Sequence, residues 1–536
     1  MKKICLLFIL LLGCFPVLAQ QNVFIIPAPQ SIEYGKGQLV WNTPLNIVCS
    51  SDLADEANLL KKCLINDYKS TSFINKTGTK NADITLTIDN KIGSEPTGAY
   101  ELIIHSKGVN IKAAEKSGIY YGIQSLLQII HKEQDGLALR KLTIKDFPAF
   151  QWRAFMLDES RNFKGKEVVE ELLDRMGRLK MNIFHWHLTD DQGWRIEIKK
   201  YPELTKIGSC RDSTQTGGEA ENRIYDGIPQ CGFYTQKDIK EIVKYANERH
   251  ITVIPEIEMP GHATAAVAAY PWLGLAGDSL KVSCSWGTNY NVFNVASPRV
   301  IQFIEDVIDE LITLFPSPVI HVGGDEVRYN QWEKSDYVQK YMKQNNISSP
   351  SDLQVQFTNR ISNLIKSKGK RMIGWNEITG DKLHEFQLSE DKKETNQKLA
   401  DGTIVQFWKG DIGLIQKTAE KGYDIVNSFH EYTYLDYDNN QIPLEKAYAF
   451  SPVPEGLPAY LRTKIVGGGC QMWSERIPSV EEMYGKIFPR ITAYAECFWT
   501  LPQNKNYKHF EQSLSYLKSN AAIYPQTNKE QVKTKK

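Results

Sequence analysis

The segment Val319-Ile320-His321-Val322-Gly323-Gly324-Asp325-Glu326 is the most informative part of the sequence. An apolar run as long as a buried strand ends in two glycines and then in two carboxylates. Seven other short apolar runs occur after residue 148, and helical stretches separate them. The eight expected strands cover residues 153–158, 182–187, 252–257, 319–323, 371–375, 403–408, 423–427 and 464–473.

Strands that alternate with helices predict an α/β protein, and eight of them over about 350 residues predict a (β/α)8 or TIM barrel. Helices are expected at residues 167–179, 236–248, 298–314, 352–366, 412–419 and 480–495. A long doubly wound sheet is the alternative. The barrel is favoured because no Gly-x-Gly-x-x-Gly fingerprint follows an early strand.

The part of the chain before the barrel has a different pattern. Three short segments alternate between apolar and polar side chains, as half-buried strands do, and a fourth has helical spacing. The strands are expected at residues 83–88, 100–104 and 109–113, and the helix at residues 118–130. A turn-like break at residues 146–148 marks a boundary. We therefore expect a small α+β domain over residues 20–148, the barrel over residues 149–524 and a polar tail over residues 525–536.

The first 19 residues are typical of a secretory signal peptide. Two lysines precede the apolar run 4–12, and residues 17–20 read Val-Leu-Ala-Gln, a small-residue cleavage site. Lipidation at Cys14 is the alternative, because Leu-Leu-Gly precedes it as in a bacterial lipoprotein. No other segment reaches the length of a membrane span. We expect an exported protein, in the periplasm or on the surface of a Gram-negative-type bacterium.

Charge and cysteine content narrow the classes of protein further. The 64 basic and 63 acidic residues give a net charge of +1, which argues against a nucleic-acid-binding protein. Of nine cysteines, none forms a Cys-x-x-Cys pair, so a zinc ribbon has no support. Cys210 and Cys231 bracket a polar loop, which is compatible with a disulfide between them or with two free thiols.

Polar side chains recur at the C-terminal ends of the expected strands, where barrel enzymes carry their active sites. Asp325 and Glu326 follow the fourth strand and two glycines, which let the backbone approach a ligand closely. Neighbouring residues point in different directions, so this pair need not flank one bond as the two carboxylates of most glycosidases do. One carboxylate would protonate a leaving group while the other contacts a different part of the substrate. The alternative is an ordinary solvated Asp-Glu pair.

Aromatic side chains give a second indication of function. The chain has 11 tryptophans, and all but one lie after residue 148. Trp375, Trp408 and Trp473 lie at the ends of three different strands, and Tyr434 follows another. Indole rings pack well against the apolar faces of sugars, so the set favours a sugar pocket over simple barrel packing.

A metal-dependent hydrolase is a competing interpretation. His185 and His187 share one face of a strand, and His321 with nearby carboxylates would complete a site. Apolar neighbours at Phe184 and Trp186 instead favour packing, and no His-Glu-x-x-His motif is present. We expect neither a metal nor another cofactor.

Several motifs together resemble those of glycoside hydrolase family 20, the exo-acting β-N-acetylhexosaminidases. The resemblance spans nearly the whole chain after the signal peptide. In order, the motifs are residues 26–29 (Ile-Pro-Ala-Pro), 118–128, 158–161 (Asp-Glu-Ser-Arg), 185–192 (His-Trp-His-Leu-Thr-Asp-Asp-Gln), 260–262 (Pro-Gly-His), 323–326 (Gly-Gly-Asp-Glu) and 471–475 (Gln-Met-Trp-Ser-Glu). The resemblance implies a small α/β domain before a catalytic barrel. It also implies hydrolysis of terminal β-linked GlcNAc or GalNAc, in which the substrate's own 2-acetamido group is the nucleophile.

The resemblance assigns catalytic roles to three residues. Glu326 is similar to the general acid that protonates the leaving oxygen and then activates water. Its pKa is expected to be raised by burial and by the charge of Asp325. Asp325 resembles the residue that orients the acetamide N–H and stabilises its developing charge, and Tyr434 resembles the donor to the acetamide oxygen.

The resemblance also assigns substrate-binding roles. Trp375, Trp408 and Trp473 look like the indoles that enclose the acetamide and support the sugar face. Arg161 is similar to the arginine that binds the 3- and 4-hydroxyls.

The remaining site residues are polar. Asp436 and Glu475 resemble acceptors for the 4- and 6-hydroxyls, and Asp190 with His262 resembles a polar relay that tunes the acid. Glu258 departs from the family, which often has Asp there, so no role is assigned to it.

Three competing functions differ from this one in substrate or in chemistry. The expected partner is a glycan with a terminal β-linked GlcNAc or GalNAc, and no nucleic acid is expected. A disaccharide-releasing enzyme of the same fold, similar to a lacto-N-biosidase, would need a wider pocket. A non-catalytic sugar-binding protein would be expected to lack Asp325 or Glu326, and both are present. The metal-dependent barrel hydrolase is the third.

Overall fold

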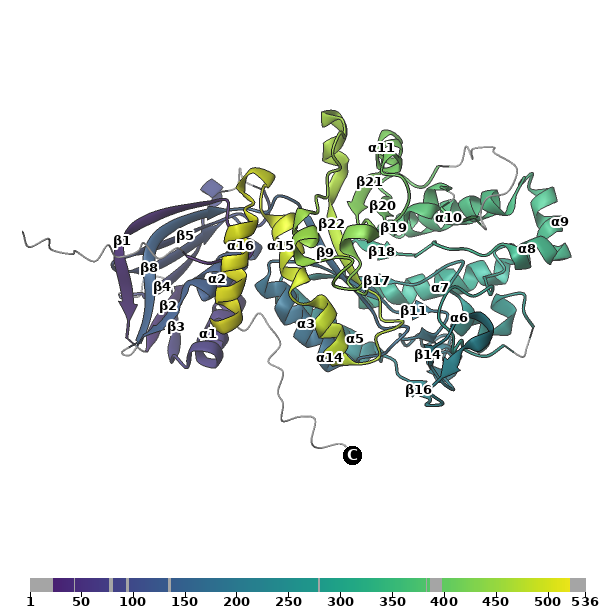
Figure 1. The fold of residues 1–536 in the computed structure, drawn as a ribbon, viewed down its shortest axis with the longest axis horizontal. Helices are drawn as coiled ribbons and strands as arrows, with labels where there is room; N and C mark the ends of the chain where they lie inside the picture. Colours follow the sequence, from purple (N-terminus) through teal and green to yellow (C-terminus); the bar gives the residue numbers. More distant parts are fainter. Residues whose placement is uncertain are drawn as a thin grey trace, which may run out of the picture.

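The structure, a computed structural model, describes residues 23–42, 44–76, 81–92, 96–133, 136–277, 280–381, 383–385 and 398–520. The expected signal peptide, with Cys14, and the polar tail lie outside the described residues. A sheet with two helices on one face forms one end of the molecule, and a barrel forms the other (Figure 1). Among the described residues, no helix is both long and apolar enough to cross a bilayer.

Eight parallel strands close into a barrel, which confirms the expected fold. In chain order they are β9 (Trp152–Asp158), β10 (Ile183–His187), β17 (Thr252–Glu256), β18 (Val319–His321), β19 (Arg371–Trp375), β20 (Ile404–Phe407), β21 (Asp424–Asn427) and β22 (Ile465–Met472). One layer of apolar side chains, among them Ala154, Ile254 and Ile373, fills the interior near the strand starts. The polar ends of the strands therefore meet at the opposite, C-terminal mouth.

Helices cover the outside of the barrel, and the last of them is buried along its whole length. They are α3 (Lys166–Arg178), α5 (Gln236–Asn247), α7 (Pro298–Leu314), α10 (Pro350–Ser367), α11 (Gly413–Glu420), α14 (Val480–Ile487) and α15 (Arg490–Trp499). Thr235 starts α5 with a reciprocal capping box to Asp238. The single helix expected over residues 480–495 is wrong, because Phe488 and Pro489 separate α14 from α15. Proline lacks the N–H that a continuous helix would need at this position.

A disulfide cross-links the long connection between β10 and α5. Cys210 and Cys231 lie opposite each other on the antiparallel strands β13 (Cys210–Arg211) and β16 (Gln230–Cys231), and the disulfide joins them. The loop between them carries a second short ribbon, β14 (Gln215–Gly217) with β15 (Ile224–Tyr225). This outcome confirms the disulfide and removes the alternative of two free thiols.

The first domain is a mixed sheet in the order β1-β8-β5-β6-β4-β2-β3, with β7 paired to β8. The strands are β1 (Ser31–Trp41), β2 (Leu45–Cys49), β3 (Ser72–Lys76), β4 (Ile84–Ile88), β5 (Tyr100–His105), β6 (Gly108–Ala113), β7 (His131–Glu133) and β8 (Gly136–Asp146). Helices α1 (Ala54–Tyr68) and α2 (Lys116–Ile129) lie between the sheet and the rest of the molecule (Figure 1). The expected strands and helix in this region correspond to β4, β5, β6 and α2.

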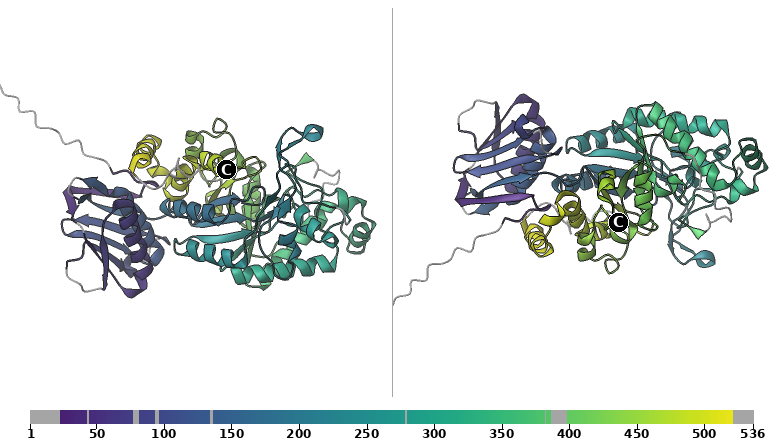
Figure 2. Two further views of the ribbon diagram at one scale, coloured as in Figure 1. Left: turned by 90° about the horizontal axis from the view of Figure 1, so that it is seen from below. Right: turned by 90° about the horizontal axis from the view of Figure 1, so that it is seen from above.

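The end of the barrel domain is part of the core of the first domain. Trp499, the last residue of α15, is fully buried among the apolar side chains of the first domain. Its Nε1 donates to Oδ1 of Asp146, and Lys180 forms a buried ion pair of 2.9 Å with the other oxygen of Asp146. Figure 2 shows α15 and the final helix α16 (Tyr507–Asn520) beside the first domain. The two domains are therefore joined through a shared interior as well as through polar contacts such as the Arg178–Asp67 ion pair.

Candidate active site

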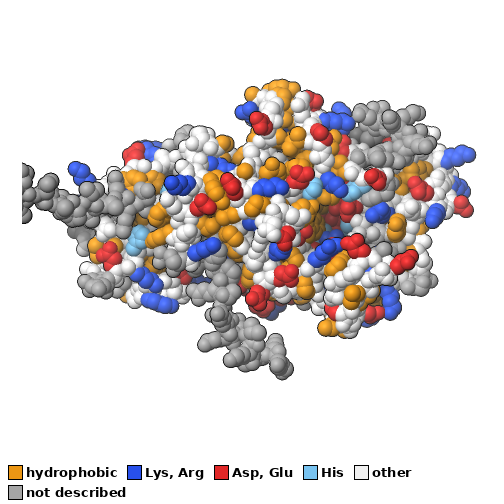
Figure 3. Space-filling model, viewed as in Figure 1, with side chains coloured by type: hydrophobic (Ala, Val, Ile, Leu, Met, Phe, Trp, Pro, Cys, Tyr) orange, Lys and Arg blue, Asp and Glu red, His pale blue; other side chains and the backbone are white. Residues whose placement is uncertain are grey.

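A cavity of about 250 Å³ opens at the C-terminal mouth of the barrel. The barrel half of the molecule is hollowed on the face seen in Figure 3, where acidic side chains are visible. The residues that line the cavity are Arg161, His262, Asp325, Glu326, Trp408, Tyr434, Asp436, Tyr437, Trp473, Glu475, Arg476 and Ile477. Nine of the eleven residues expected at the site are among them. The other two, Asp190 and Trp375, lie in the layer beneath.

A tight turn after β18 brings the two adjacent carboxylates to this cavity. Gly323 and Gly324 have φ values of 64° and 94°, which side chains other than hydrogen disfavour. A Cβ at Gly323 would lie 1.7 Å from a carboxyl oxygen of Glu258, which also accepts a hydrogen bond from the Gly324 N–H. Burial and the charges of Asp325 and Glu256 raise the pKa of Glu258 well above its ordinary value. A neutral Glu258 therefore supports the turn from below, and Gly323 leaves it the space.

The two carboxylates have different electrostatic environments. Burial raises the pKa of Asp325 to about 7, because repulsion by Glu377 and Glu326 adds to it and the attraction of His262 does not offset both. Burial acts on Glu326 in the same direction, but His262 and the hydroxyl of Thr288 outweigh it and lower the pKa of Glu326. The expected raised pKa of Glu326 is therefore wrong for the unliganded site. Of the two carboxyls, Asp325 is therefore the one that takes up a proton as the pH falls toward 7.

His262 connects this pair to a fixed anion. Its Nε2 lies 3.6 Å from Oδ2 of Asp325 and 3.7 Å from Oε2 of Glu326, and its Nδ1 lies 3.0 Å from Oδ1 of Asp190. Arg161 approaches the other oxygen of Asp190 at 2.7 Å. Despite complete burial, these two cations hold the pKa of Asp190 well below its usual range. Asp190 in turn raises the pKa of His262, so a cation faces Asp325 and Glu326.

Aromatic rings form one wall of the cavity. The rings of Trp408 and Tyr434 are nearly parallel, with centroids 6.1 Å apart, and Tyr434 lies 6.0 Å from Trp473. Trp375 is 1% exposed and lies 5.9 Å from Trp473, so it forms a second layer under the wall. Burial and the charge of Asp325 raise the pKa of Tyr434 well above its ordinary value. The Tyr434 hydroxyl is therefore a permanent hydrogen-bond donor beside Asp325.

Two further acidic side chains, Asp436 and Glu475, line the cavity. Burial, reinforced by the charge of Glu475, raises the pKa of Asp436 to about 7. Glu475 accepts a hydrogen bond of 2.6 Å from the Gly287 N–H, and burial raises its pKa although Arg161 opposes the shift. Their positions suit the expected role as acceptors for hydroxyl groups.

Three further residues near the acid were not expected from the sequence. Thr288 donates a hydrogen bond to Glu326 at 2.6 Å, and Nε2 of His384 lies 3.6 Å from the other oxygen of Glu326. Glu377 accepts a hydrogen bond of 3.0 Å from Nε1 of Trp408 and so orients that ring. Thr288 and His384 lie in loops without a periodic signal. Glu377 follows Trp375 by two residues. Its closeness to the end of a strand was the one feature of the sequence that could have placed it at the site.

His185, His187 and His321, the possible ligands of a metal-dependent hydrolase, lie below the cavity. His185 and His321, with Glu256, are spaced closely enough to hold a metal ion, and so are Asp190, Asp191 and His262. In the first group each imidazole directs a ring nitrogen at Glu256 within hydrogen-bonding distance. The chemistry of the donors therefore fits a hydrogen-bonded cluster as well as it fits a cation.

Comparison with known proteins identifies both domains. Residues 150–502 match the glycosyl hydrolase family 20 catalytic domain, and residues 22–147 match domain 2 of the same family. A β-hexosaminidase of Porphyromonas gingivalis is 34% identical over 91% of this chain, and the chain spans only 62% of that protein's length. A β-hexosaminidase of Vibrio furnissii is 33% identical over 90% of this chain and 77% of that protein.

Solved structures agree with these matches. An exo-β-N-acetylglucosaminidase from Vibrio harveyi, in complex with N-acetylglucosamine, has a TM-score of 0.78 at 30% identity and covers 92% of this chain and 76% of that chain. A β-N-acetylhexosaminidase from Bacteroides fragilis has a TM-score of 0.78 at 29% identity and covers 93% of this chain and 95% of that chain. The catalytic-domain match alone spans more than half of the sequence, and the chain therefore belongs to glycosyl hydrolase family 20.

Proposed function

We propose that this protein is an exo-acting β-N-acetylhexosaminidase that removes terminal, non-reducing, β-linked GlcNAc or GalNAc with retention of configuration. One observation carries the proposal: Asp325 and Glu326 approach the same nitrogen of His262. Because they are also neighbours in the chain, we infer that they approach a bound sugar from one side and do not face each other across the bond to be broken. An acid and a nucleophile of the usual retaining type flank that bond, so the nucleophile here is the 2-acetamido oxygen of the substrate.

Substrate binding transfers to Glu326 the proton that it needs as the general acid. The acetamide N–H donates a hydrogen bond to Asp325, which favours the charged form of that carboxyl. A charged Asp325 next to Glu326 then raises the pKa of Glu326, which takes up the proton. The substrate thus converts a pair poised with its proton on Asp325 into a general acid beside an anion.

The reaction then proceeds in two balanced steps. The acetamide oxygen attacks the anomeric carbon while Glu326 gives its proton to the departing glycosidic oxygen. The resulting oxazolinium ion is stabilised by the Asp325 carboxylate at its N–H and by the Tyr434 hydroxyl at its oxygen. Glu326, now a carboxylate, removes a proton from water, and this water attacks the anomeric carbon and restores the acetamide.

The test compares two nitrophenyl glycosides that differ only at the 2-position. Nitrophenyl β-GlcNAc should be hydrolysed, and nitrophenyl β-glucoside, which has a hydroxyl in place of the acetamide, should not. The activity should survive EDTA. Comparable turnover of the glucoside would require a nucleophile from the protein, and loss of activity with EDTA that zinc restores would establish a metal hydrolase instead.

The same assay distinguishes an exo-acting enzyme from a disaccharide-releasing enzyme and from a sugar-binding protein. The cavity is small, and Arg161, Asp436 and Glu475 all line it, which favours one terminal sugar over a disaccharide. A nitrophenyl lacto-N-bioside should therefore be a poorer substrate than nitrophenyl β-GlcNAc. A sugar-binding protein without catalysis would bind GlcNAc and release no nitrophenol.

We further propose that the protein is exported, to the periplasm or the cell surface. Support comes from the charged and apolar pattern of the first 19 residues and from the Cys210–Cys231 disulfide, because disulfides persist in oxidising compartments. Mass spectrometry of protein from fractionated cells should find Gln20 as the first residue. A lipid-modified Cys14 at the N-terminus would establish an anchored form, and an intact Met1 in the cytosol would contradict export.

A further inference from the structure

Below the cavity, one buried carboxylate lies close to four side-chain nitrogens. Glu256, the last residue of β17, is completely buried. Its Oε2 lies 2.8 Å from Nε2 of His185 and 2.5 Å from Nδ1 of His187. Its Oε1 lies 2.9 Å from Nδ1 of His321 and accepts a hydrogen bond of 2.9 Å from Nε1 of Trp375. Three of these contacts are hydrogen bonds, whereas Nδ1 of His321 accepts a hydrogen bond from the Gly323 N–H. The buried Glu256 carboxylate therefore holds His185, His187 and Trp375 in fixed orientations.

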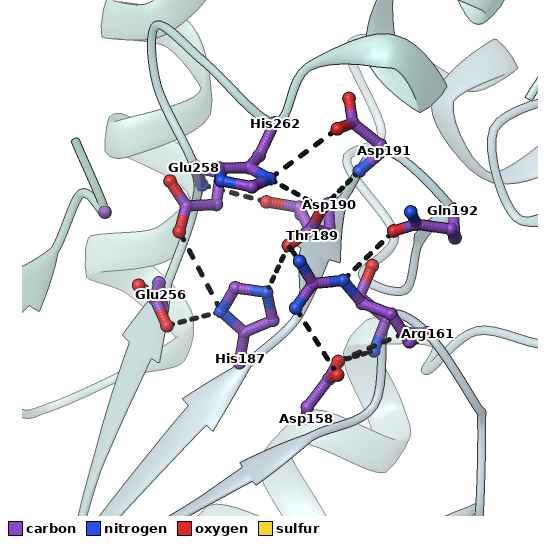
Figure 4. Close-up of polar contacts among 12 residues, drawn as sticks. Asp158, Arg161, His187, Thr189, Asp190, Asp191, Gln192, Glu256, Glu258 and His262 are labelled. Atoms are coloured by element: carbon purple, nitrogen blue, oxygen red, sulfur yellow. Dashed lines mark hydrogen bonds and ion pairs between the residues drawn. The ribbon is translucent and has the colours of Figure 1, made fainter. Parts of the chain in front are cut away.

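One of these partners continues toward the catalytic pair. Nε2 of His187 lies 2.9 Å from Oδ2 of Asp190, and Asp190 contacts His262, which faces Asp325 and Glu326. Figure 4 shows the first part of this series, with His187 between Glu256 and Asp190 and with His262 beyond Asp190. Carboxylates and imidazoles therefore alternate from the barrel interior to the acid.

Of the two histidines that contact the same Glu256 oxygen, His187 carries the positive charge and His185 is neutral. Burial acts against the charged form of His187, but Glu256 and Asp190 outweigh it and raise the pKa of His187 to about 10. Burial dominates for His185 and lowers its pKa to about 4. The other charged or titratable groups near Glu256 and His187 are His321, which stacks on His185 at 4.3 Å, Glu258 at 4.0 Å from His187, Asp158, and Arg161 on the far side of Asp190.

We propose that Glu256 is a positioning residue of the reaction. Through His187 it fixes Asp190 and thereby the imidazole of His262 against Asp325 and Glu326, and through Trp375 it fixes the layer beneath the aromatic wall. The inference rests on the proposed function, because it concerns how the acid of that reaction is held. Glu256 itself touches no substrate, so its contribution is made entirely through its neighbours.

Glu256→Gln tests the proposal with little change in shape. The amide supplies an acceptor and a donor of the same size, so His187 keeps two hydrogen-bond partners but loses the adjoining charge. The pKa of His187 should then fall toward the ordinary histidine value of about 6.5. For nitrophenyl β-GlcNAc we expect kcat to fall on the order of tenfold at pH 8 while KM changes less than about twofold. The pH profile of kcat should also gain one further ionisation, that of His187, in addition to those of the wild type.

Two further variants make the result specific. His185→Gln removes another partner of the same Glu256 oxygen. Because His185 does not lie between Glu256 and Asp190, the pH profile of this variant should keep the wild-type shape. His187→Gln removes the titrating group, so it should lower kcat at every pH without adding an ionisation.

The outcomes separate this proposal from the proposed function. A folded Glu256→Gln protein whose loss of kcat is the same at every pH would mean that Glu256 serves packing alone, and the proposal would be overturned. If Glu256→Gln does not fold, wild-type kcat in His187→Gln would overturn it equally. A wild-type protein that fails to hydrolyse nitrophenyl β-GlcNAc would instead refute the proposed function.

Discussion

The hydroxyl of Thr288 donates a hydrogen bond of 2.6 Å to Oε2 of Glu326, the carboxyl oxygen that also lies nearest to His262. Thr288 belongs to a loop without helix or strand, and the preceding residue of this loop, Gly287, binds Glu475 through its N–H. One loop therefore holds the proposed acid and a proposed acceptor for the sugar hydroxyls. His262 is the larger cause of the lowered pKa of Glu326, and the hydrogen bond from Thr288 adds to it, because a hydrogen bond to a carboxylate favours its charged form.

Replacement of Thr288 by valine should move the basic limb of the kcat/KM profile to higher pH. Without the hydroxyl, the pKa of Glu326 rises, so the acid keeps its proton to a higher pH. A net hydrogen bond of about 0.5–1.5 kcal/mol corresponds to a shift of roughly half a pH unit to one unit. Thr288→Ser retains the hydroxyl and should keep the wild-type profile. A shift toward lower pH in the valine variant would contradict the interaction.

Replacement of Glu326 by glutamine should affect substrates according to their leaving groups. A natural glycan needs a proton on its departing oxygen, so hydrolysis should fall by roughly 10²–10⁴-fold. A dinitrophenyl glycoside needs little protonation and should lose much less. Asp325→Asn should lower kcat on both substrates, because acetamide orientation is needed whatever the leaving group. Equal losses of Glu326→Gln on both substrates would remove this residue from the acid role.

Replacement of Tyr434 by phenylalanine should lower kcat more than it raises KM. The ring remains in the aromatic wall beside Trp408 and Trp473, so the ground-state sugar keeps its packing. The lost hydroxyl is the proposed donor to the oxazolinium oxygen, and one such donor contributes about 10²–10³-fold to kcat. The oxazolinium-like inhibitor thiazoline should bind more weakly to the variant, whereas GlcNAc should bind nearly as well. An unchanged kcat would show that another group supplies this donor.

Replacement of Lys180 by methionine should destabilise the whole protein. The change leaves Asp146 buried without its cation, and loss of one partner of a buried ion pair costs about 3–5 kcal/mol of unfolding free energy. Chemical denaturation followed by tryptophan fluorescence measures the loss. Lys206→Met breaks a solvent-exposed pair with Glu203 and should leave the unfolding midpoint unchanged. Similar midpoints for both variants would mean that the interior pair contributes little.

The barrel could be predicted because buried parallel strands are continuous apolar runs. The structure has a strand within each of the eight expected ranges, with ends that differ by a few residues. The first domain was harder to predict, since its edge strand β1 is largely exposed and its pairing with β8 shifts register between Tyr34 and Gln38. Such a strand lacks the alternation that a half-buried strand provides.

The site was predictable where the topology alone brings residues together. Side chains that follow barrel strands meet at one mouth, which is why Arg161, His262 and Glu475 could be placed there without a structure. Thr288 and His384 could not, because nothing in a loop sequence fixes its path. His187 was interpreted as packing because Phe184 and Trp186 are apolar. In a strand, however, side chains alternate, and the histidines point to the opposite face from those two rings.

The shared interior of the two domains has a consequence for the order of events at the ribosome. Domains commonly fold as they emerge, the N-terminal one first. Here the indole of Trp499 and the carboxyl of Asp146, which bond each other inside the first domain, are 353 residues apart. At a synthesis rate of about 5–20 residues per second, the residue that completes the interior of the first domain is made roughly 18–70 seconds after Asp146. Until then its unfilled apolar face is a natural binding site for a chaperone.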